Sequence, residues 1–202
     1  MKIKIQLIVL LICMVTLTAC SIFSPVKLPP ENSYMLTAVP TDLSNRPMHP
    51  LTLLVMPPET EAAYHTTQMA YTIKPYQIAY FQQNRWAETP SQMFFMLLTQ
   101  SLSRTHYYRS VVTPPYVGPY DYILKTNILK LQQNYMYHSA LVELTVQATL
   151  IQASTNQVVA DKQFSITVPM RMRSPYGGVI AANSATKQLL KNIVLFSVRN
   201  SK

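Results

Sequence analysis

Alternation of apolar and polar residues predicts a pair of β-strands in the second half of the chain. From Val142 to Leu150 every second residue is apolar and the residues between are polar. The pattern returns from Val158 to Val168, with Lys162 as an exception, after a turn at 154–157. Because successive side chains of a strand point to opposite faces, each run predicts a strand with one buried and one polar face.

Six further segments have the composition of strands. Leu51–Met56 is a continuous apolar run that ends at two prolines, which favours a buried central strand. In the segment 121–133 the apolar positions change parity near Asn127, and either a β-bulge or two buried faces would explain this. The remaining candidates lie at 33–39, 70–73, 77–81 and 107–113.

Two segments show the periodicity of helices. Thr89 can cap a helix in which Pro90 occupies the first position. Its apolar stripe consists of Met93, Phe94, Leu97, Leu98 and Leu102. A second helix is predicted from about Gly178 to Ser197, with one apolar face and a polar face that carries Asn183, Lys187 and Lys191. The pattern therefore predicts an α+β fold, a mostly antiparallel β-sheet packed by two helices.

Trp86 is the only tryptophan and lies between a predicted strand and the first helix. A large aromatic side chain at this position can anchor both layers, so we interpret Trp86 as a buried structural anchor. The alternative is a tryptophan that contacts a ligand.

The first twenty residues have the features of a bacterial lipoprotein signal. Lys2 and Lys4 precede the apolar run Ile5–Val15, which is too short to span a bilayer. Leu17-Thr18-Ala19-Cys20 then fits the lipobox, in which the cysteine is acylated and becomes the mature N-terminus. We expect a signal peptide at 1–19 and lipidation, including palmitate, at Cys20. Ser21 favours sorting to the periplasmic face of the outer membrane.

The segment 20–50 is rich in proline and predicts a lipid-anchored tether with one short strand. A tether that reaches from Cys20 to Leu51 could extend to roughly 100 Å. The folded domain is then expected at 51–202. Cys13 lies in the segment that cleavage removes, so the mature chain keeps no free thiol for a disulfide or a metal.

Composition argues against an enzyme. The chain has three glycines and no phosphate-binding loop, its four histidines are scattered, and its three aspartates and five glutamates do not suggest a catalytic pair. We therefore expect no catalytic residue, no metal site and no cofactor. The formal net charge of +9 is compatible with nucleic-acid binding, but an exported protein does not encounter nucleic acid. Anionic lipid or an acidic partner remains open.

Seven of the thirteen tyrosines lie between 107 and 137. Tyrosine is enriched at protein interfaces because it combines apolar area with a polar tip. We take Tyr116, Tyr135 and Tyr137 as candidate partner contacts. Strand propensity with ordinary cross-strand packing is the alternative explanation.

Two motifs resemble the ABC-type transport auxiliary lipoprotein family (PqiC-like). They are Tyr71…Ile78-Ala79-Tyr80…Arg85-Trp86-Ala87-Glu88-Thr89-Pro90 with its helix, and Tyr176-Gly177-Gly178-Val179-Ile180-Ala181-Ala182-Asn183. The resemblance implies a fold akin to the TolB N-terminal domain. It also implies a non-catalytic outer-membrane lipoprotein that assists an inner-membrane ABC transporter and an MCE-type periplasmic lipid-binding protein in lipid transport through the cell envelope.

Two questions remain open at this point. The chain could instead be a scaffold or plug of another envelope machine, for lipopolysaccharide insertion or secretion. Whether it forms a homo-oligomer is not indicated by any residue pattern.

Overall fold

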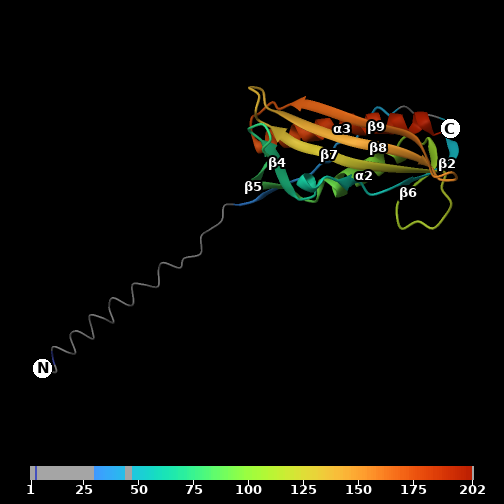
Figure 1. The fold of residues 1–202 in the computed structure, drawn as a ribbon, viewed down its shortest axis with the longest axis horizontal. Coiled ribbons are helices and arrows are strands. Elements are labelled where there is room, and N and C mark those ends of the chain that lie inside the picture. The colour runs from blue at the N-terminus through green and yellow to red at the C-terminus, as the bar shows by residue number, and fades with distance from the viewer. Residues whose placement is uncertain (1–2, 4–29, 44–46, 202) are drawn as a thin grey trace. The chain divides into compact units, whose positions relative to one another are not determined.

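The structure is a computed structural model that describes residues 3, 30–43 and 47–201 (Figure 1). The chain divides into two units, 1–30 and 31–202, and the second contains the sheet and the helices described below. The predicted signal peptide, apart from residue 3, and the lipobox with Cys20 lie outside the described residues.

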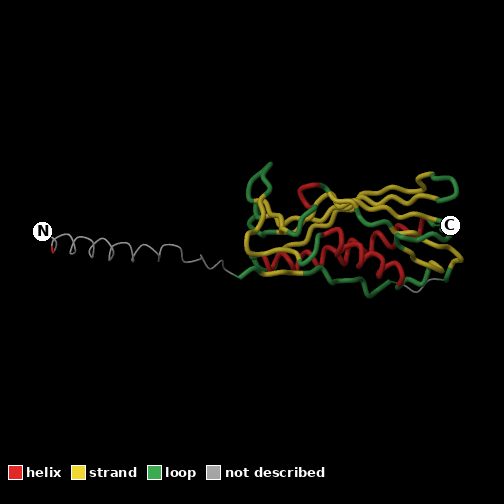
Figure 2. The backbone as a smooth tube through the Cα atoms, turned by 90° about the horizontal axis from the view of Figure 1, so that it is seen from below, coloured by secondary structure: helices red, strands yellow, loops and turns green. Residues whose placement is uncertain are grey.

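Nine strands form one sheet in the described part of the chain. They are β1 (Asn32–Tyr34), β2 (His49–Val55), β3 (Glu59–Thr60), β4 (Gln68–Thr72), β5 (Ala79–Trp86), β6 (Tyr108–Val112), β7 (Tyr122–Asn134), β8 (Leu141–Gln152) and β9 (Gln157–Pro169). The helices are α2 (Pro90–Ser103), α3 (Pro175–Asn200) and the short 3-10 helix η2 (Ala62–Tyr64). Figure 2 shows α2 and α3 beside each other against the sheet.

The long strand β7 is the axis of the sheet. Along one edge it pairs antiparallel with β8, which pairs in turn with β9. Along the other edge it pairs parallel with β2, then β3, then β4. The sheet therefore divides on this side: β6 extends the part that begins with β2, while β5 and β1 extend the part that begins with β4 (Figure 1).

The prediction of a mostly antiparallel sheet is wrong, because the sheet is mixed and its centre is largely parallel. Five strand pairings are parallel and three are antiparallel. Alternating side chains indicate that one face of a strand is covered, but they do not indicate its direction. Direction depends on the connections, and the α2 crossover between β5 and β6 permits parallel arrangements that a tight hairpin excludes.

A β-bulge explains the change of parity in β7. Ile128 is opposite Val146 and Lys130 is opposite Thr145, so Leu129 is the extra residue. Ile128 and Leu131 are both buried although they are three positions apart. The bulge turns the second half of β7 so that its apolar side chains stay on the helix side.

The two helices match their predicted segments and cover one face of the sheet. Thr89 accepts from the Gln92 backbone amide, and the Gln92 side chain in turn accepts from the Thr89 amide, which forms a capping box. The predicted apolar stripe of α2 is buried, as is that of α3. No helix among the described residues is long and apolar enough to cross a membrane.

The edge strand β9 is more exposed than its alternation predicted. Phe164 is its only buried residue, and Val158 is 58% exposed. Ala160, Ile166 and Val168 are half-buried. Among the described strands it pairs only with β8 and has a free edge, so its apolar pattern is not matched by full burial.

Residues 31–43, which were expected in a tether, pack on the folded unit. Leu36 is 4% exposed and its amide donates to Met93 Sδ over 3.3 Å. Asn183 Oδ1 accepts from the amides of Thr37 and Ala38 at 2.8 and 3.1 Å, and its Nδ2 donates to the Met35 carbonyl at 3.1 Å.

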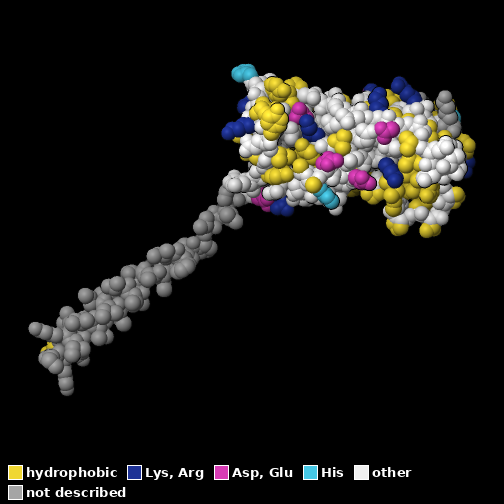
Figure 3. All heavy atoms as spheres, in the orientation of Figure 1, with side chains coloured by type: hydrophobic (Ala, Val, Ile, Leu, Met, Phe, Trp, Pro, Cys, Tyr) yellow, Lys and Arg dark blue, Asp and Glu magenta, His cyan; other side chains and the backbone are white. Residues whose placement is uncertain are grey.

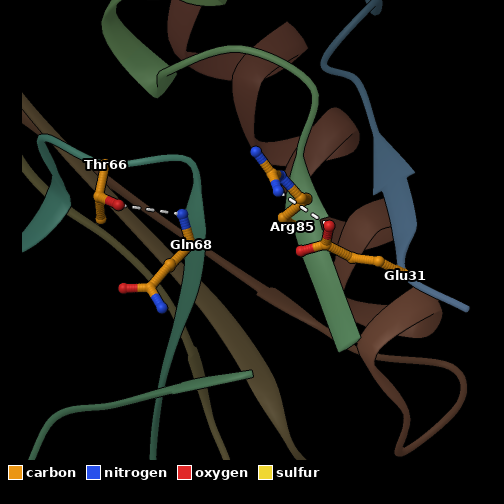
Figure 4. A network of polar contacts seen from close by, with 4 residues as sticks. All are labelled: Glu31, Thr66, Gln68 and Arg85. Atoms are coloured by element: carbon orange, nitrogen blue, oxygen red, sulfur yellow. Dashed lines mark hydrogen bonds and ion pairs between the residues drawn. The ribbon is translucent and has the colours of Figure 1, made fainter. Parts of the chain in front are cut away.

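Ion pairs fix both ends of this segment. Arg85 contacts Glu31 at 2.8 Å beside the β1–β5 pairing (Figure 4). At the other end Lys191 donates to Asp42, and this hydrogen bond lowers the pKa of the Asp42 carboxyl group. The predicted polar face of the last helix therefore holds the N-terminal segment through Asn183 and Lys191, while Lys187 is exposed.

Candidate interaction surfaces at the two ends of the sheet

Trp86 is the last residue of β5 and is 3% exposed. Its amide donates to the Thr67 carbonyl over 2.7 Å. A cavity beside it, bordered by Gly178 and Ala182 of α3, has a volume of about 10 Å³. That space is too small for an organic ligand, so the surroundings of Trp86 are those of a packed side chain.

Two glycines allow close approaches at the start of α3, Gly178 to β7 and Gly177 to the loop before the helix. A Cβ atom on Gly178 would lie 2.0 Å from Gln133 Cδ, and one on Gly177 would lie 2.1 Å from the Met172 carbonyl oxygen. Gln133 uses the space to donate to the Pro175 carbonyl over 3.1 Å. This close approach gives a physical reason for the Gly-Gly motif, which the sequence alone showed only as a resemblance.

The structure separates the three candidate contact tyrosines. Tyr116 lies in the loop before β7, whereas Tyr135 and Tyr137 follow its end. Since β7 has 13 residues, the two groups are roughly 40 Å apart. Tyr116 is 38% exposed and its neighbour Val117 is fully exposed. The tyrosines that cluster in sequence therefore do not form one surface.

Tyr135 packs in an aromatic cluster at one end of the sheet. Its ring lies 6.2 Å from Tyr71 and 6.3 Å from Phe81, and the Arg173 guanidinium lies 5.2 Å from its centroid. Burial raises the pKa of Tyr135 to about 12, against the opposing effect of Arg173. Tyr137, in contrast, is 56% exposed.

Tyr107 and Tyr108 are buried at the opposite end, against the end of α3. Tyr107 donates to the Ser201 carbonyl over 2.6 Å, and the Tyr108 hydroxyl lies 2.6 Å from Ser197 Oγ and 2.8 Å from Ser201 Oγ. Burial raises the pKa of Tyr108 to about 12, although the two serine hydrogen bonds lower it. These tyrosines serve packing.

A hollow of about 440 Å³ opens between the β4–β5 turn and the β7–β8 turn. Its polar wall is a hydrogen-bonded chain in which Tyr64 donates to Gln132 and Gln132 donates to Glu143, at 2.9 and 2.8 Å. Burial, together with the Glu143 charge, raises the pKa of Tyr64 to about 12. The sequence analysis missed this hollow because its two turns are 60 residues apart in the chain, and only the β4–β7 pairing joins them.

In the described part of the chain, the side chains do not form a cluster of the kind that binds a metal ion. Across 30–43 and 47–201, no group of three His, Cys, Asp or Glu side chains could hold a metal ion. Exposed hydrophobic side chains instead gather at both ends of the sheet, over the β4–β5 turn at the left and the β6–β7 loop at the lower right (Figure 3).

The fold defines an α+β domain with a mixed sheet and two helices. The chain belongs to a family of lipoproteins, the ABC-type transport auxiliary lipoprotein component family, whose model matches residues 34–194. The family resemblance predicted from the two motifs is thereby confirmed, and the family description associates the chain with ABC-type transport. No curated protein matches the chain.

Solved structures share the fold. A Xanthomonas campestris protein of the DUF330 family is 17% identical, with a TM-score of 0.77 over 84% of this chain and 96% of that chain. An uncharacterized protein is 16% identical, with a TM-score of 0.67 over 83% and 99%. A hypothetical Chlamydia trachomatis protein is 9% identical, with a TM-score of 0.53 over 75% and 98%.

Proposed function

We propose that this chain is a non-catalytic lipoprotein, anchored through Cys20 at the periplasmic face of the outer membrane, that assists an ABC-type lipid transport system. Its direct partner is an MCE-type periplasmic lipid-binding protein, which connects it to the inner-membrane transporter. The observation that carries this proposal is the family membership over residues 34–194. The transport ATPase belongs to another subunit.

The position of the first strand supports an orientation for this role. Glu31 follows Cys20 by eleven positions, so the chain between them spans at most about 40 Å. Glu31 contacts Arg85 of β5, a strand of the β4–β5 hairpin. We infer that the short connection favours an orientation with this hairpin toward the membrane and the β6–β7 loop toward the periplasm.

The β6–β7 loop has the chemistry of a contact site. Three prolines between 113 and 121 restrict its backbone, so little conformational entropy is lost when it binds. It presents the exposed side chains of Tyr116 and Val117. We assign the contact with the partner protein to this loop.

A photo-crosslinking amino acid at Tyr116 tests the proposal in intact cells. We expect mass spectrometry of the adduct to identify an MCE-type protein, because this loop faces the periplasm. The matched control is the same amino acid at Lys187, an exposed position on α3, which should capture less. Adducts at Tyr116 that contain only components of a lipopolysaccharide or secretion machine would contradict the transport role.

A further inference from the structure

Three loops meet at the end of the sheet where the first strand enters. They are the β4–β5 turn (73–78), the β7–β8 turn (135–139) and the β9–α3 loop (170–174). The first two border the same hollow. Arg173 of the third loop donates to the carbonyls of Tyr135 and Tyr137 over 2.7 and 2.8 Å. We call the surface of these three loops the hairpin end.

The hairpin end combines exposed apolar side chains with cations. Its exposed hydrophobic residues are Ile73, Tyr76, Ile78, Met136, Tyr137 and Met172. It also carries Lys74, Arg171 and Arg173, and the three loops contain no aspartate or glutamate. Tyrosine with aliphatic and basic side chains is the combination that binds at the boundary between lipid headgroups and acyl chains.

Tyr76 is held in an unfavourable backbone conformation at the tip of this surface. Its φ is 62°, in the left-handed region that a bulky residue rarely adopts, and its side chain is fully exposed. Strain of this kind persists where it contributes to function. Here it directs a large aromatic ring away from the folded unit.

We propose that the hairpin end inserts shallowly into the headgroup region of the membrane that holds the lipid anchor, and that it prefers anionic phospholipids. The position of β1, through which the chain connects to Cys20, is consistent with contact between the hairpin end and this membrane. Asn32 pairs with Asn84, five positions from the start of β5 at Ala79, so β1 begins roughly 17 Å from the turn. The inference rests on the proposed Cys20 anchor and not on the transport partner.

Spin-label accessibility in the full mature lipoprotein tests the insertion. With Cys20 acylated, a cysteine introduced as Tyr76→Cys is the only free thiol, and mass spectrometry of the lipidated N-terminal peptide verifies the anchor separately. The protein is reconstituted in vesicles of phosphatidylethanolamine with phosphatidylglycerol. We expect the ratio of oxygen to nickel-complex collisions to be several-fold higher at position 76 than at Val117→Cys, the matched position in the β6–β7 loop. Equal, aqueous ratios at both positions would overturn the proposal.

Neutralising two cations tests the preference for anionic lipid. We expect Lys74→Gln and Arg171→Gln each to lower the ratio of inserted to aqueous label at position 76 roughly fivefold. Lys187→Gln, at an exposed position on α3, should leave it unchanged. Insertion that is equal with and without phosphatidylglycerol would overturn the lipid preference.

A photo-crosslinking amino acid at Tyr76 distinguishes the membrane from a protein partner in intact cells. A phospholipid adduct supports insertion, and an adduct with protein alone overturns it.

Discussion

At the scale of single residues, Trp86 is expected to contribute strongly to the stability of the folded unit. It is 3% exposed between β5 and α3, and replacing a buried Trp with Ala typically costs about 3–5 kcal/mol. We expect Trp86→Ala to lower the free energy of unfolding by this amount, measured from the denaturant midpoint at constant slope. Met96→Ala on α2, where the side chain is 67% exposed, is the control and should change it by less than about 0.5 kcal/mol. A wild-type midpoint for Trp86→Ala would contradict the anchor role.

Tyr108 should make stability depend on alkaline pH. Its pKa rises to about 12 on folding, mainly through burial, and the unfolded value is about 10. The folded state therefore binds more protons between these values, so its stabilisation is complete below pH 10 and is lost as the pH rises through 12. A shift of this size corresponds to at most about 2.7 kcal/mol.

The variant Tyr108→Phe separates this effect from the hydrogen bonds. At pH 7 it should lower the free energy of unfolding by about 1–2 kcal/mol, because its bonds with Ser197 and Ser201 are lost. Between pH 10 and 12 the variant should then lose less stability than the wild type, since it has no phenol to ionise. Urea unfolding at a series of pH values measures the difference, and a constant difference would show that Tyr108 does not titrate in this range.

At the scale of elements, Asn183 of α3 holds the segment that follows β1. Its side chain bonds the backbone of Met35, Thr37 and Ala38. We expect Asn183→Ala to speed hydrogen exchange of the Thr37 and Ala38 amides at least tenfold, which corresponds to about 1.4 kcal/mol of local opening. Asn192→Ala, at an exposed position of the same helix, should leave these amides unchanged. Unchanged exchange in Asn183→Ala would show that other contacts, such as the burial of Leu36 and the Lys191–Asp42 ion pair, are sufficient to hold the segment.

The sequence was sufficient to predict the elements whose pattern is local. The Thr89-Pro90 start and the apolar stripe predicted α2, and strict alternation predicted β8. The parity change near Asn127 indicated the bulge, although it left a second explanation open. In each case, neighbouring residues contain the information because they share one helix turn or one strand face.

Contacts between distant segments could not be predicted in this way. Asn183 bonds residues that precede it by about 145 positions, and no periodicity encodes that pairing. A polar helix face looks the same in sequence whether it meets water or the backbone of another segment. The separation of the tyrosines between 107 and 137 could not be predicted for a similar reason. The length of β7 places Tyr116 and Tyr137 at opposite ends of the sheet.

At the scale of the whole molecule, the ends of the sheet differ in chemistry. The hairpin end carries Lys74, Arg171 and Arg173 beside exposed apolar side chains, whereas the β6–β7 loop has Tyr116 and Val117 and no cation. Since residues 31–43 pack on the folded unit, at most about ten residues remain as a free connection to Cys20. A short connection restricts the orientations of the domain more than the roughly 100 Å tether that the sequence suggested.

This orientation requires that Cys20 is lipidated, which is the final prediction. One buried methylene contributes about 0.8 kcal/mol, so a single acyl chain binds only marginally, whereas the three chains of a bacterial lipoprotein hold it stably. We expect wild-type protein to incorporate a radioactive fatty acid. Cys20→Ala should lose the label and accumulate as a precursor with the mass of the unprocessed chain. Cys13→Ala is the matched control, since residue 13 lies in the segment that cleavage removes, and it should be labelled and processed like the wild type. Wild-type protein without label would contradict the anchor at Cys20. A Cys13→Ala variant that loses the label would show that Cys13, and not Cys20, is the modified cysteine.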